Sequence, residues 1–171
     1  MRFYYFDASV LVKAYLWEVG TEDVRRVLAS AFAAPSEVRI VTSRFAFVEV
    51  ASAVARRGFA GELTEDEVNG LWSRLQEDFA EFDPAYTLTD PHPEVVGQAA
   101  ELTRQHRLRA IDAIHLASGI GVRRRTPSGA SFRFASADRR LSAGALAELF
   151  DVFDPRSPVP PGTSTPVAPG G

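Results

Sequence analysis

The sequence predicts an α/β fold, a three-layer α/β/α sandwich around a central, mostly parallel sheet. Short apolar runs alternate along the chain with longer segments whose apolar residues recur at helical spacing. The short runs lack polar alternation, which is typical of strands buried on both faces, as in parallel sheets. Strands and helices in alternation therefore indicate parallel strands with helices covering both faces.

The first strand is predicted at residues 3–6, where four aromatic residues precede Asp7. Apolar residues at helical spacing follow, and they predict a helix that ends at Gly20. Thr21 and the two acids after it predict the cap and first turn of a second helix, because a hydroxyl oxygen and negative charge suit the positive end of a helix.

The next predicted strand covers residues 38–41, which are apolar apart from Arg39. A helix is expected over residues 44–57 and is closed by Gly58, since glycine is common just beyond the end of a helix. Thr64 and Glu67 have the spacing of a capping box, so a further helix is expected from Thr64 to about residue 79.

The second half of the chain repeats the alternation. The predicted elements are a strand at 86–88, helices at 93–106 and 110–122, a strand at 131–135, a helix at 138–149 and a last strand that contains Val152. After residue 153 the composition changes to Pro, Gly, Ser and Thr, with little to bury. We therefore expect one domain over residues 1–153 and a disordered tail over residues 154–171.

The amino-acid composition excludes several kinds of site. The chain has no cysteine, which excludes disulfides, thiol catalysis and zinc ribbons, and its three histidines make an imidazole-based zinc site hard to assemble. A bound metal would therefore have oxygen ligands. No apolar stretch approaches the ~20 residues of a membrane span, and the N-terminus leads directly into a strand, so a cytoplasmic protein without a membrane partner is expected.

Charge is distributed unevenly along the chain, although the net charge is only −3. Residues 62–94 contain ten acids and one base, whereas residues 101–140 contain nine arginines and three acids. A basic surface of this kind can follow a phosphate backbone, but it can equally be a solvated charged face. The arginines considered for nucleic-acid binding are Arg109, Arg123, Arg124, Arg125, Arg139 and Arg140.

Four carboxylates occupy positions where solvation argues against a charge or where strands end. Asp7 follows four aromatics, Glu49 and Asp112 lie in apolar helical segments, and Asp138 follows the strand at 131–135. Each has a simple alternative explanation. Asp7 and Asp138 could cap helices, Glu49 could pair with an arginine, and Asp112 could bond to His115 one turn away.

Taken together, the four acids predict a metal site. Asp7 and Asp138 follow strands, and ligands of parallel α/β sheets bind at the carboxyl ends of the strands. Two carboxylates ~4 Å apart repel by about 4 kcal/mol at an effective dielectric of ~20, and a divalent cation reverses the sign of that energy. Oxygen ligands without thiolates favour Mg²⁺ or Mn²⁺.

Four segments of the chain resemble the four motifs of PIN-domain nucleases, and in particular the VapC-type toxins of type II toxin–antitoxin pairs. The segments are residues 6–15 (FDASVLVKAY), 47–53 (FVEVASA), 108–117 (LRAIDAIHLA) and 134–141 (FASADRRL). They occur in the family's order and spacing over roughly residues 2–152. A longer, arginine-rich connection at residues 121–131 is the one departure.

The resemblance implies an enzyme that hydrolyses single-stranded or looped RNA with Mg²⁺ or Mn²⁺. It places catalytic, metal-holding roles on Asp7, Glu49, Asp112 and Asp138, with Glu49 either a ligand or the group that orients the attacking water. Ser9 and Ser136 are expected to donate hydrogen bonds to the carboxylates, or to make local turns instead. His115 is expected to support a carboxylate or to be a core histidine. A small antitoxin protein and a homodimer are the implied partners.

Three other functions are alternatives to a metal-dependent ribonuclease. A PIN-like module could bind RNA or protein without cutting, but all four acids are present. A metal-dependent DNA nuclease would use the same acids, because both nucleic acids present a phosphodiester. An aspartate-nucleophile phosphoryl transferase normally has a second acid two residues after the first, where this chain has Ser9, and it lacks a phosphate-binding glycine loop.

Overall fold

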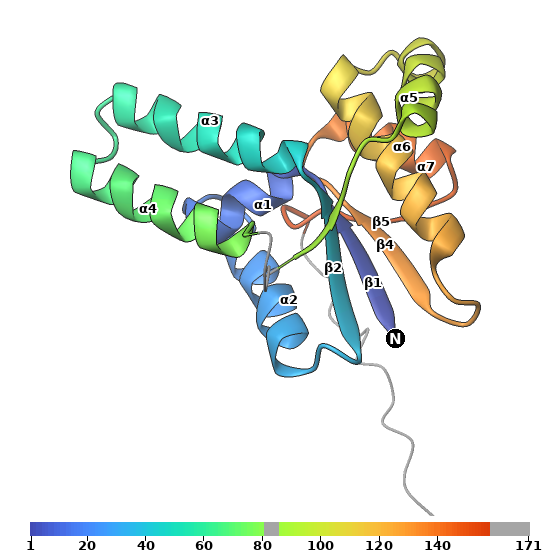
Figure 1. Ribbon diagram of the computed structural model, residues 1–171, viewed down its shortest axis with the longest axis horizontal. Coiled ribbons are helices and arrows are strands. Elements are labelled where there is room, and N and C mark those ends of the chain that lie inside the picture. The colour runs from blue at the N-terminus through green and yellow to red at the C-terminus, as the bar shows by residue number, and fades with distance from the viewer. Residues whose placement is uncertain (81–85, 158–171) are drawn as a thin grey trace, which may run out of the picture.

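Five parallel strands form the central sheet in residues 1–80 and 86–157, the part of the chain that the computed structural model describes (Figure 1). The spatial order of the strands is β3-β2-β1-β4-β5, with β1 in the middle. The strands are β1 (Arg2–Phe6), β2 (Val38–Ser43), β3 (Thr87–Thr89), β4 (Ser131–Ala135) and β5 (Asp151–Phe153).

Helices cover both faces of the sheet, which confirms the predicted three-layer α/β/α fold. Helices α1 to α4 pack on one face and α5 to α7 on the other (Figure 1). The helices are α1 (Ala8–Tyr15), α2 (Thr21–Ala33), α3 (Phe45–Phe59), α4 (Glu65–Asp78), α5 (Pro93–His106), α6 (Ala110–Arg125) and α7 (Arg139–Ala147).

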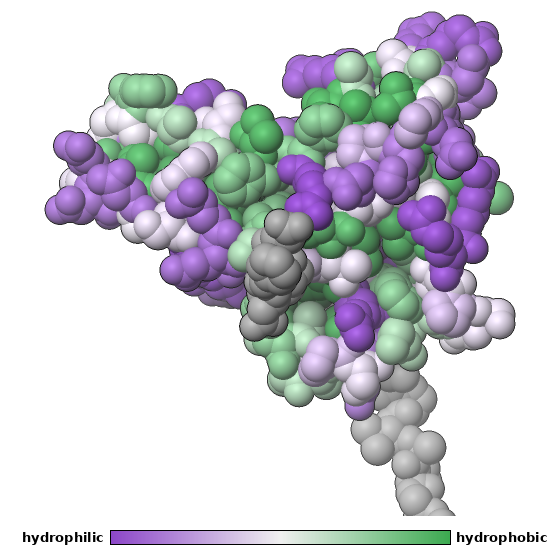
Figure 2. Space-filling view, viewed as in Figure 1, coloured by the Kyte–Doolittle hydropathy of each residue, from purple (hydrophilic) through white to green (hydrophobic). Residues whose placement is uncertain are grey.

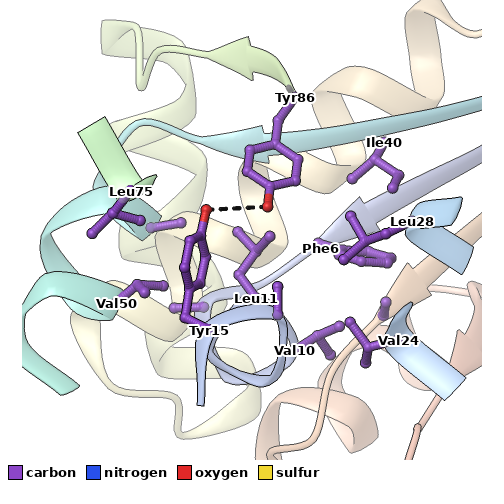
Figure 3. Close-up of a cluster of buried hydrophobic side chains, with 14 of the residues drawn as sticks. Phe6, Val10, Leu11, Tyr15, Val24, Leu28, Ile40, Val50, Leu75 and Tyr86 are labelled. Atoms are coloured by element: carbon purple, nitrogen blue, oxygen red, sulfur yellow. Dashed lines mark hydrogen bonds between the residues drawn. The ribbon is translucent and has the colours of Figure 1, made fainter. Parts of the chain in front are cut away.

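The alternation of side chains along β1 divides the core into two parts. Tyr4 and Phe6 belong to the cluster beneath α1 to α4, in which Tyr15 and Tyr86 hydrogen-bond through their hydroxyls at 3.2 Å (Figure 3). Tyr5 points to the opposite face and stacks on Phe134, with ring centroids 5.2 Å apart. Both faces of the strand are therefore buried, as its unbroken aromatic run predicts.

Two predicted caps are wrong in position. Helix α1 ends at Tyr15, and Gly20 is the N-cap of α2 rather than the end of α1. Gly20 has a φ of +90°, and a Cβ there would lie 2.4 Å from the carbonyl oxygen of Pro155, so only glycine fits. Thr21 lies inside the first turn, where its hydroxyl accepts from the Glu18 N–H at 2.9 Å.

Two helices end later in the sequence than predicted. Helix α3 continues past Gly58 to Phe59, and the left-handed residue that follows it is Gly61. Helix α6 extends to Arg125, so part of the connection predicted at 121–131 is helical. Three arginines in its last turn suit the negative end of the helix dipole. The capping box of Thr64 and Glu67 is confirmed, with both reciprocal bonds formed.

The first residues of the predicted tail pack against the domain. Pro155 is buried beside Gly20, and Asp154 pairs with Arg156. Residues 158–171, the remainder of that tail, lie outside the described residues. Within residues 1–80 and 86–157, no helix combines the length and apolar character needed to cross a bilayer.

Candidate active site

The carboxyl ends of β1 and β4 bring two predicted site residues together. The two strands pair in parallel with Phe6 opposite Ala135, so the residues that follow them, Asp7 and Ser136, are neighbours. The Asp7 N–H continues the ladder by donating to the Ala135 carbonyl at 3.1 Å. Sheet register alone therefore joins segments that are 129 positions apart in the sequence.

Asp7 is buried in a network of hydrogen-bond donors. Its Oδ1 accepts from the Val10 N–H at 3.0 Å, which makes Asp7 the N-cap of α1. The Ser9 hydroxyl lies 2.7 and 2.9 Å from the two carboxylate oxygens, and the Ser136 hydroxyl donates to Oδ2 at 2.7 Å. Both serines thus hydrogen-bond to the Asp7 carboxylate, and Asp7 caps α1, which is the simpler of the two explanations for it.

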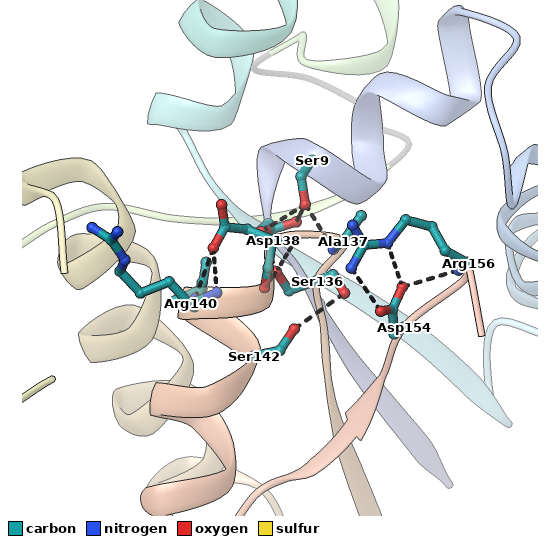
Figure 4. Close-up of polar contacts among 10 residues, drawn as sticks. Ser9, Ser136, Ala137, Asp138, Arg140, Ser142, Asp154 and Arg156 are labelled. Atoms are coloured by element: carbon teal, nitrogen blue, oxygen red, sulfur yellow. Dashed lines mark hydrogen bonds and ion pairs between the residues drawn. The ribbon is translucent and has the colours of Figure 1, made fainter. Parts of the chain in front are cut away.

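The two serines also connect Asp7 to the loop after β4. The Ser9 hydroxyl oxygen accepts from the Ala137 N–H at 2.8 Å, and the Ser136 hydroxyl oxygen accepts from the Asp138 N–H at 3.0 Å (Figure 4). Asp138 in turn caps α7, because its Oδ1 accepts from the N–H groups of Arg140 and Leu141. The loop is therefore held in one conformation beside Asp7.

The pKa shifts of the acids indicate which of them lie close together. Burial raises the pKa of Asp7 above its usual value, although His115 and the hydrogen bonds from both serines act against the rise. Burial also raises the pKa of Asp112, and the negative charges of Asp138 and Glu49 raise it further. Asp112 is therefore close enough to Asp138 and Glu49 to be repelled by them, which a cation would relieve.

Glu49 is oriented by a buried histidine. The Glu49 Oε2 lies 2.6 Å from His115 Nε2, and His115 Nδ1 lies 3.0 Å from the Tyr5 hydroxyl. Burial raises the pKa of Tyr5, so its hydroxyl keeps the proton and can donate to Nδ1. Nε2 then carries the hydrogen that is donated to Glu49. The partner of His115 is thus Glu49, and neither an arginine on Glu49 nor a bond from His115 to Asp112 is found in the described residues.

An open pocket lies between the N-terminal ends of α6 and α7. Two carboxylates, Asp112 and Asp138, line it together with Arg109, Arg139, Arg140 and Arg156. Three of the six arginines considered for nucleic-acid binding therefore lie beside two of the four acids. Their positive charge can hold a phosphate that the carboxylates alone would repel.

The other three arginines lie at the far end of α6. Arg123, Arg124 and Arg125 are in its last turn, about 18 Å along the helix axis from Asp112 at 1.5 Å per residue. The Arg123 guanidinium packs over the Phe150 ring at 3.9 Å and donates to the carbonyls of Glu148 and Leu149. The structure does not bring these three residues to the acids, and Arg123 has a structural role there.

The acids fit a hydrated oxygen-liganded cation better than a closed cage. Within residues 1–80 and 86–157, no three Asp, Glu or His side chains are arranged to hold one ion. Asp112, however, is half-buried among other acids and has no hydrogen-bond partner in this part of the chain. Mg²⁺ usually keeps several waters and uses only one or two protein carboxylates, so such a set suits it.

Sequence reasoning missed two residues of this site. Tyr5 orients His115, and its one signal was a hydroxyl in a strand buried on both faces, where it needs a partner. Arg156 lines the pocket from a segment predicted to be a disordered tail. Its only sequence signal was Asp154 two residues earlier, since aspartate commonly bonds a backbone N–H two positions on.

Comparison with known proteins identifies the family. Residues 4–123 match the PIN domain. The chain belongs to the PIN domain family. The PIN assignment predicted from the four motifs is thereby confirmed.

Two curated PIN relatives from Mycobacterium tuberculosis are similar over most of the chain. Ribonuclease VapC45 of strain CDC 1551 / Oshkosh is 34% identical over 147 residues, covering 86% of this chain and 92% of the relative. Ribonuclease VapC49 of strain ATCC 25618 / H37Rv gives the same values.

Solved structures share the PIN fold at lower identity. FitAcB from Neisseria gonorrhoeae superposes with a TM-score of 0.60 at 18% identity, covering 90% of this chain and 97% of that chain. A toxin–antitoxin complex from Klebsiella pneumoniae gives a TM-score of 0.55 at 14% identity, covering 91% and 98%.

Proposed function

We propose that this PIN domain is a metal-dependent endoribonuclease and the toxin of a type II toxin–antitoxin pair. The observation that carries the proposal is the pairing of Asp112 and Asp138 in a pocket lined by arginines, next to the loop that Ser136 connects to Asp7. The names of the M. tuberculosis relatives, which are ribonucleases, support RNA as the substrate.

Each acid has a defined part in the proposed reaction. Asp7 is held by four hydrogen-bond contacts from Ser9, Ser136 and Val10, so its carboxylate is already oriented before substrate binds. Asp112 and Asp138 face the pocket and complete the negatively charged set. Mg²⁺ or Mn²⁺ bound by these acids would supply an activated water and offset the charge that develops on the phosphate.

Glu49 is the residue that orients the attacking water or takes its proton. The His115 Nε2–H fixes one oxygen of Glu49, and half-burial leaves the carboxylate accessible from the site. Because His115 is itself held by Tyr5, the chain Tyr5–His115–Glu49 limits the rotation of the carboxylate. Arg109, Arg139 and Arg140 would bind phosphates of the RNA on the rim of the pocket.

A small antitoxin is the proposed protein partner. One similar structure is described as a toxin–antitoxin complex, and another as FitAB bound to a DNA fragment. An antitoxin guanidinium inserted among the acids would neutralise the charges that a cation neutralises. A homodimer and a cytoplasmic location remain part of the proposal.

The experiment that tests the function is cleavage of a panel of single-stranded and structured RNAs by the purified full chain. We expect cleavage with Mg²⁺ or Mn²⁺, none with EDTA, and a loss of at least about 10³-fold in Asp7→Asn and Asp112→Asn, because transition-state charge is then less well stabilised. Asp151→Asn, which alters an exposed aspartate on β5, is the matched control and should cleave normally.

Two outcomes would contradict the proposal. Cleavage of DNA with RNA left intact would identify a DNA nuclease. Metal-independent RNA binding that is unchanged in both acid variants, with no cleavage of any substrate, would identify a binding module.

A further inference from the structure

Arg156 stands out among the arginines of the pocket because its side chain is fixed. Its Nε and Nη2 donate to the two oxygens of Asp154 at 3.0 and 2.8 Å, and its backbone N–H donates to the same carboxylate at 3.0 Å. Arg109 and Arg139 have no such bond in the described residues, and Arg140 makes only a 3.5 Å contact with the Arg107 carbonyl.

The position of Arg156 is set by the packing of the segment after β5. Pro155 is buried, and its carbonyl approaches Gly20 so closely that a Cβ at position 20 would lie 2.4 Å away. This contact holds the backbone next to α2 and directs residue 156 to the loop that contains Ala137 (Figure 4). The guanidinium is therefore positioned before any ligand binds.

Arg156 separates two open hollows on the surface. One is the pocket that contains Asp112 and Asp138, and the other is lined by Ser9, Arg56 and the ion pair of Lys13 and Glu18; Arg156 and Ala137 border both. Its side chain is about one-third exposed, at 33%, so it is accessible to a ligand that crosses from one hollow to the other. A single-stranded chain lying over both hollows would pass Arg156 where it passes the acids.

We propose that Arg156 binds the RNA phosphate next to the one being cleaved and so sets the register of the strand over the acids. The inference rests on the proposed function and deepens it by adding a residue that positions the substrate. Asp154 holds Nε and one side of Nη2, and Nη1 has no partner in residues 1–80 and 86–157, so an edge of the guanidinium remains for a phosphate.

The charges around Arg156 agree with this role. No carboxylate of the predicted site lies within ion-pair distance of it in the described residues, where Asp154 is its one partner. Asp138 and Asp7 are nevertheless near enough to favour its charged form. Arg156 thus lies near the acids but forms no ion pair with them. The acids can therefore still bind a cation, and Arg156 can still bind an anion.

The test compares variants of Arg156 and Asp154 with a matched pair elsewhere. Binding of a labelled single-stranded RNA is measured in EDTA against salt concentration, and kcat and KM for cleavage are measured with Mn²⁺. The variants are Arg156→Ala, Arg156→Lys and Asp154→Asn, with Arg133→Ala as the control because Arg133 forms an exposed pair with Asp151 at 2.7 Å.

We expect Arg156→Ala to weaken RNA binding about tenfold and to lower the salt slope by about 0.7, the value for one lost phosphate contact on a single strand. Arg156→Lys should recover the salt slope but not kcat/KM, since lysine cannot form the same fork with Asp154 and phosphate. Asp154→Asn should lower kcat/KM while Arg156 keeps its charge. Mn²⁺ affinity, measured by calorimetry, should not fall in any of these variants, and Arg133→Ala should match wild type.

The outcomes separate this inference from the proposed function. If wild type cleaves RNA and Arg156→Ala cleaves and binds it equally well, the inference is wrong and the proposed function stands. Faster cleavage by Arg156→Ala would also overturn it, because Arg156 would then act as an internal counter-ion. If wild type neither binds nor cleaves RNA, both fail.

Discussion

Asp7 carries two roles that are usually assigned to different residues. It caps α1 through Oδ1 and belongs to the acidic set, with Ser9 and Ser136 bonded to the same carboxylate. A cap needs an oxygen acceptor but no charge, so asparagine would serve α1 almost as well. The helix therefore does not need the buried charge, which the proposed metal site would use.

The charge of Asp112 should lower the stability of the metal-free protein. In EDTA, Asp112→Asn should raise the Tm by up to about 2 °C, because repulsion from Asp138 and Glu49 is relieved and solvent screens only part of it. Mn²⁺ should raise the Tm of wild type but not of the variant. Differential scanning fluorimetry measures both shifts, with Asp151→Asn as the control. An equal Mn²⁺ shift in wild type and Asp112→Asn would argue against the site.

The raised pKa of Asp7 predicts how stability depends on pH. Between its ordinary pKa of 3.8 and the raised value in the fold, the folded state binds a proton that the unfolded state releases. The free energy of unfolding should therefore decrease as pH rises through that interval. Urea unfolding of wild type and Asp7→Asn in EDTA, from about pH 4 to 7, measures the effect. The stability of the variant relative to wild type should grow with pH, and a constant difference would contradict the assignment.

Helix α6 holds two site residues, and its place against the sheet depends on one glycine. Gly119 faces β4, where a Cβ would lie 2.7 and 2.8 Å from ring carbons of Phe134. Phe134 is fully buried and stacked on Tyr5, so the ring cannot turn away. The closeness of α6 to β4 therefore sets how far Asp112 and His115 project beyond the sheet edge.

Gly119→Ala should destabilise the protein by about 1–3 kcal/mol, because overpacking outweighs the gain in helix propensity. Gly70→Ala on α4 is the matched control, since a Cβ there meets nothing within 4 Å. It should stabilise the protein by about 0.5–1 kcal/mol. Urea unfolding measures both, and a neutral Gly119→Ala would show that α6 can shift.

Local sequence patterns were sufficient to predict the helices and strands, but not all of the residues at which they begin and end. Helix α4 was predicted from its capping box, and β1 from its aromatic run, because both signals lie within a few residues. Gly20 and Gly58 were misassigned because their neighbours in space decide their roles. A Cβ at Gly58 would lie 2.8 Å from Val68, so this glycine allows α3 and α4 to pack closely.

In the candidate site, too, local sequence patterns predict some features, whereas contacts between distant residues decide the others. The acids are candidates from the sequence because a carboxylate in an apolar segment needs an explanation, whichever partner it has. The bond between His115 and Glu49 joins residues 66 positions apart, and no local pattern contains it. Arg156 was missed because proline and glycine around it indicate disorder, whereas burial of Pro155 against Gly20 orders that segment.

At the scale of the molecule, the candidate acids lie at the carboxyl edge of the sheet, between the helices of one face and those of the other. The N-terminal ends of α3 and α6 approach the carboxyl edge of the sheet from opposite sides (Figure 1). On the face shown in Figure 2, hydrophobic side chains gather over α3, and hydrophilic ones gather at the outer end of α4 and around α5. Exposed Phe45 and Val48 of α3 offer apolar surface near this edge, which suits a protein partner that covers the site.

Expression in a bacterial host tests the activity of the whole molecule. Wild type should arrest growth, whereas Asp7→Asn and Asp138→Asn should be tolerated, because loss of one carboxylate costs orders of magnitude in rate. Growth curves and RNA sequencing of fragment ends are the measurements, with Asp151→Asn as the control. Co-expression of the proposed antitoxin should restore growth. Arrest of equal strength with both acid variants would exclude a toxin that acts through these residues.

The strand order also determines when the site can form during synthesis. β1 is made first but lies in the middle of the sheet, and its neighbour β4 is complete only at residue 135. Asp138 and Arg156 come later still, so a growing chain has Asp7 with its local partners Ser9 and Val10 long before it has Ser136. Contacts this distant in sequence form more slowly than local ones. The aspartate that comes first in the chain thus gains its bond from Ser136 only once β4 has paired with β1, so the candidate site is among the last parts of the fold to form.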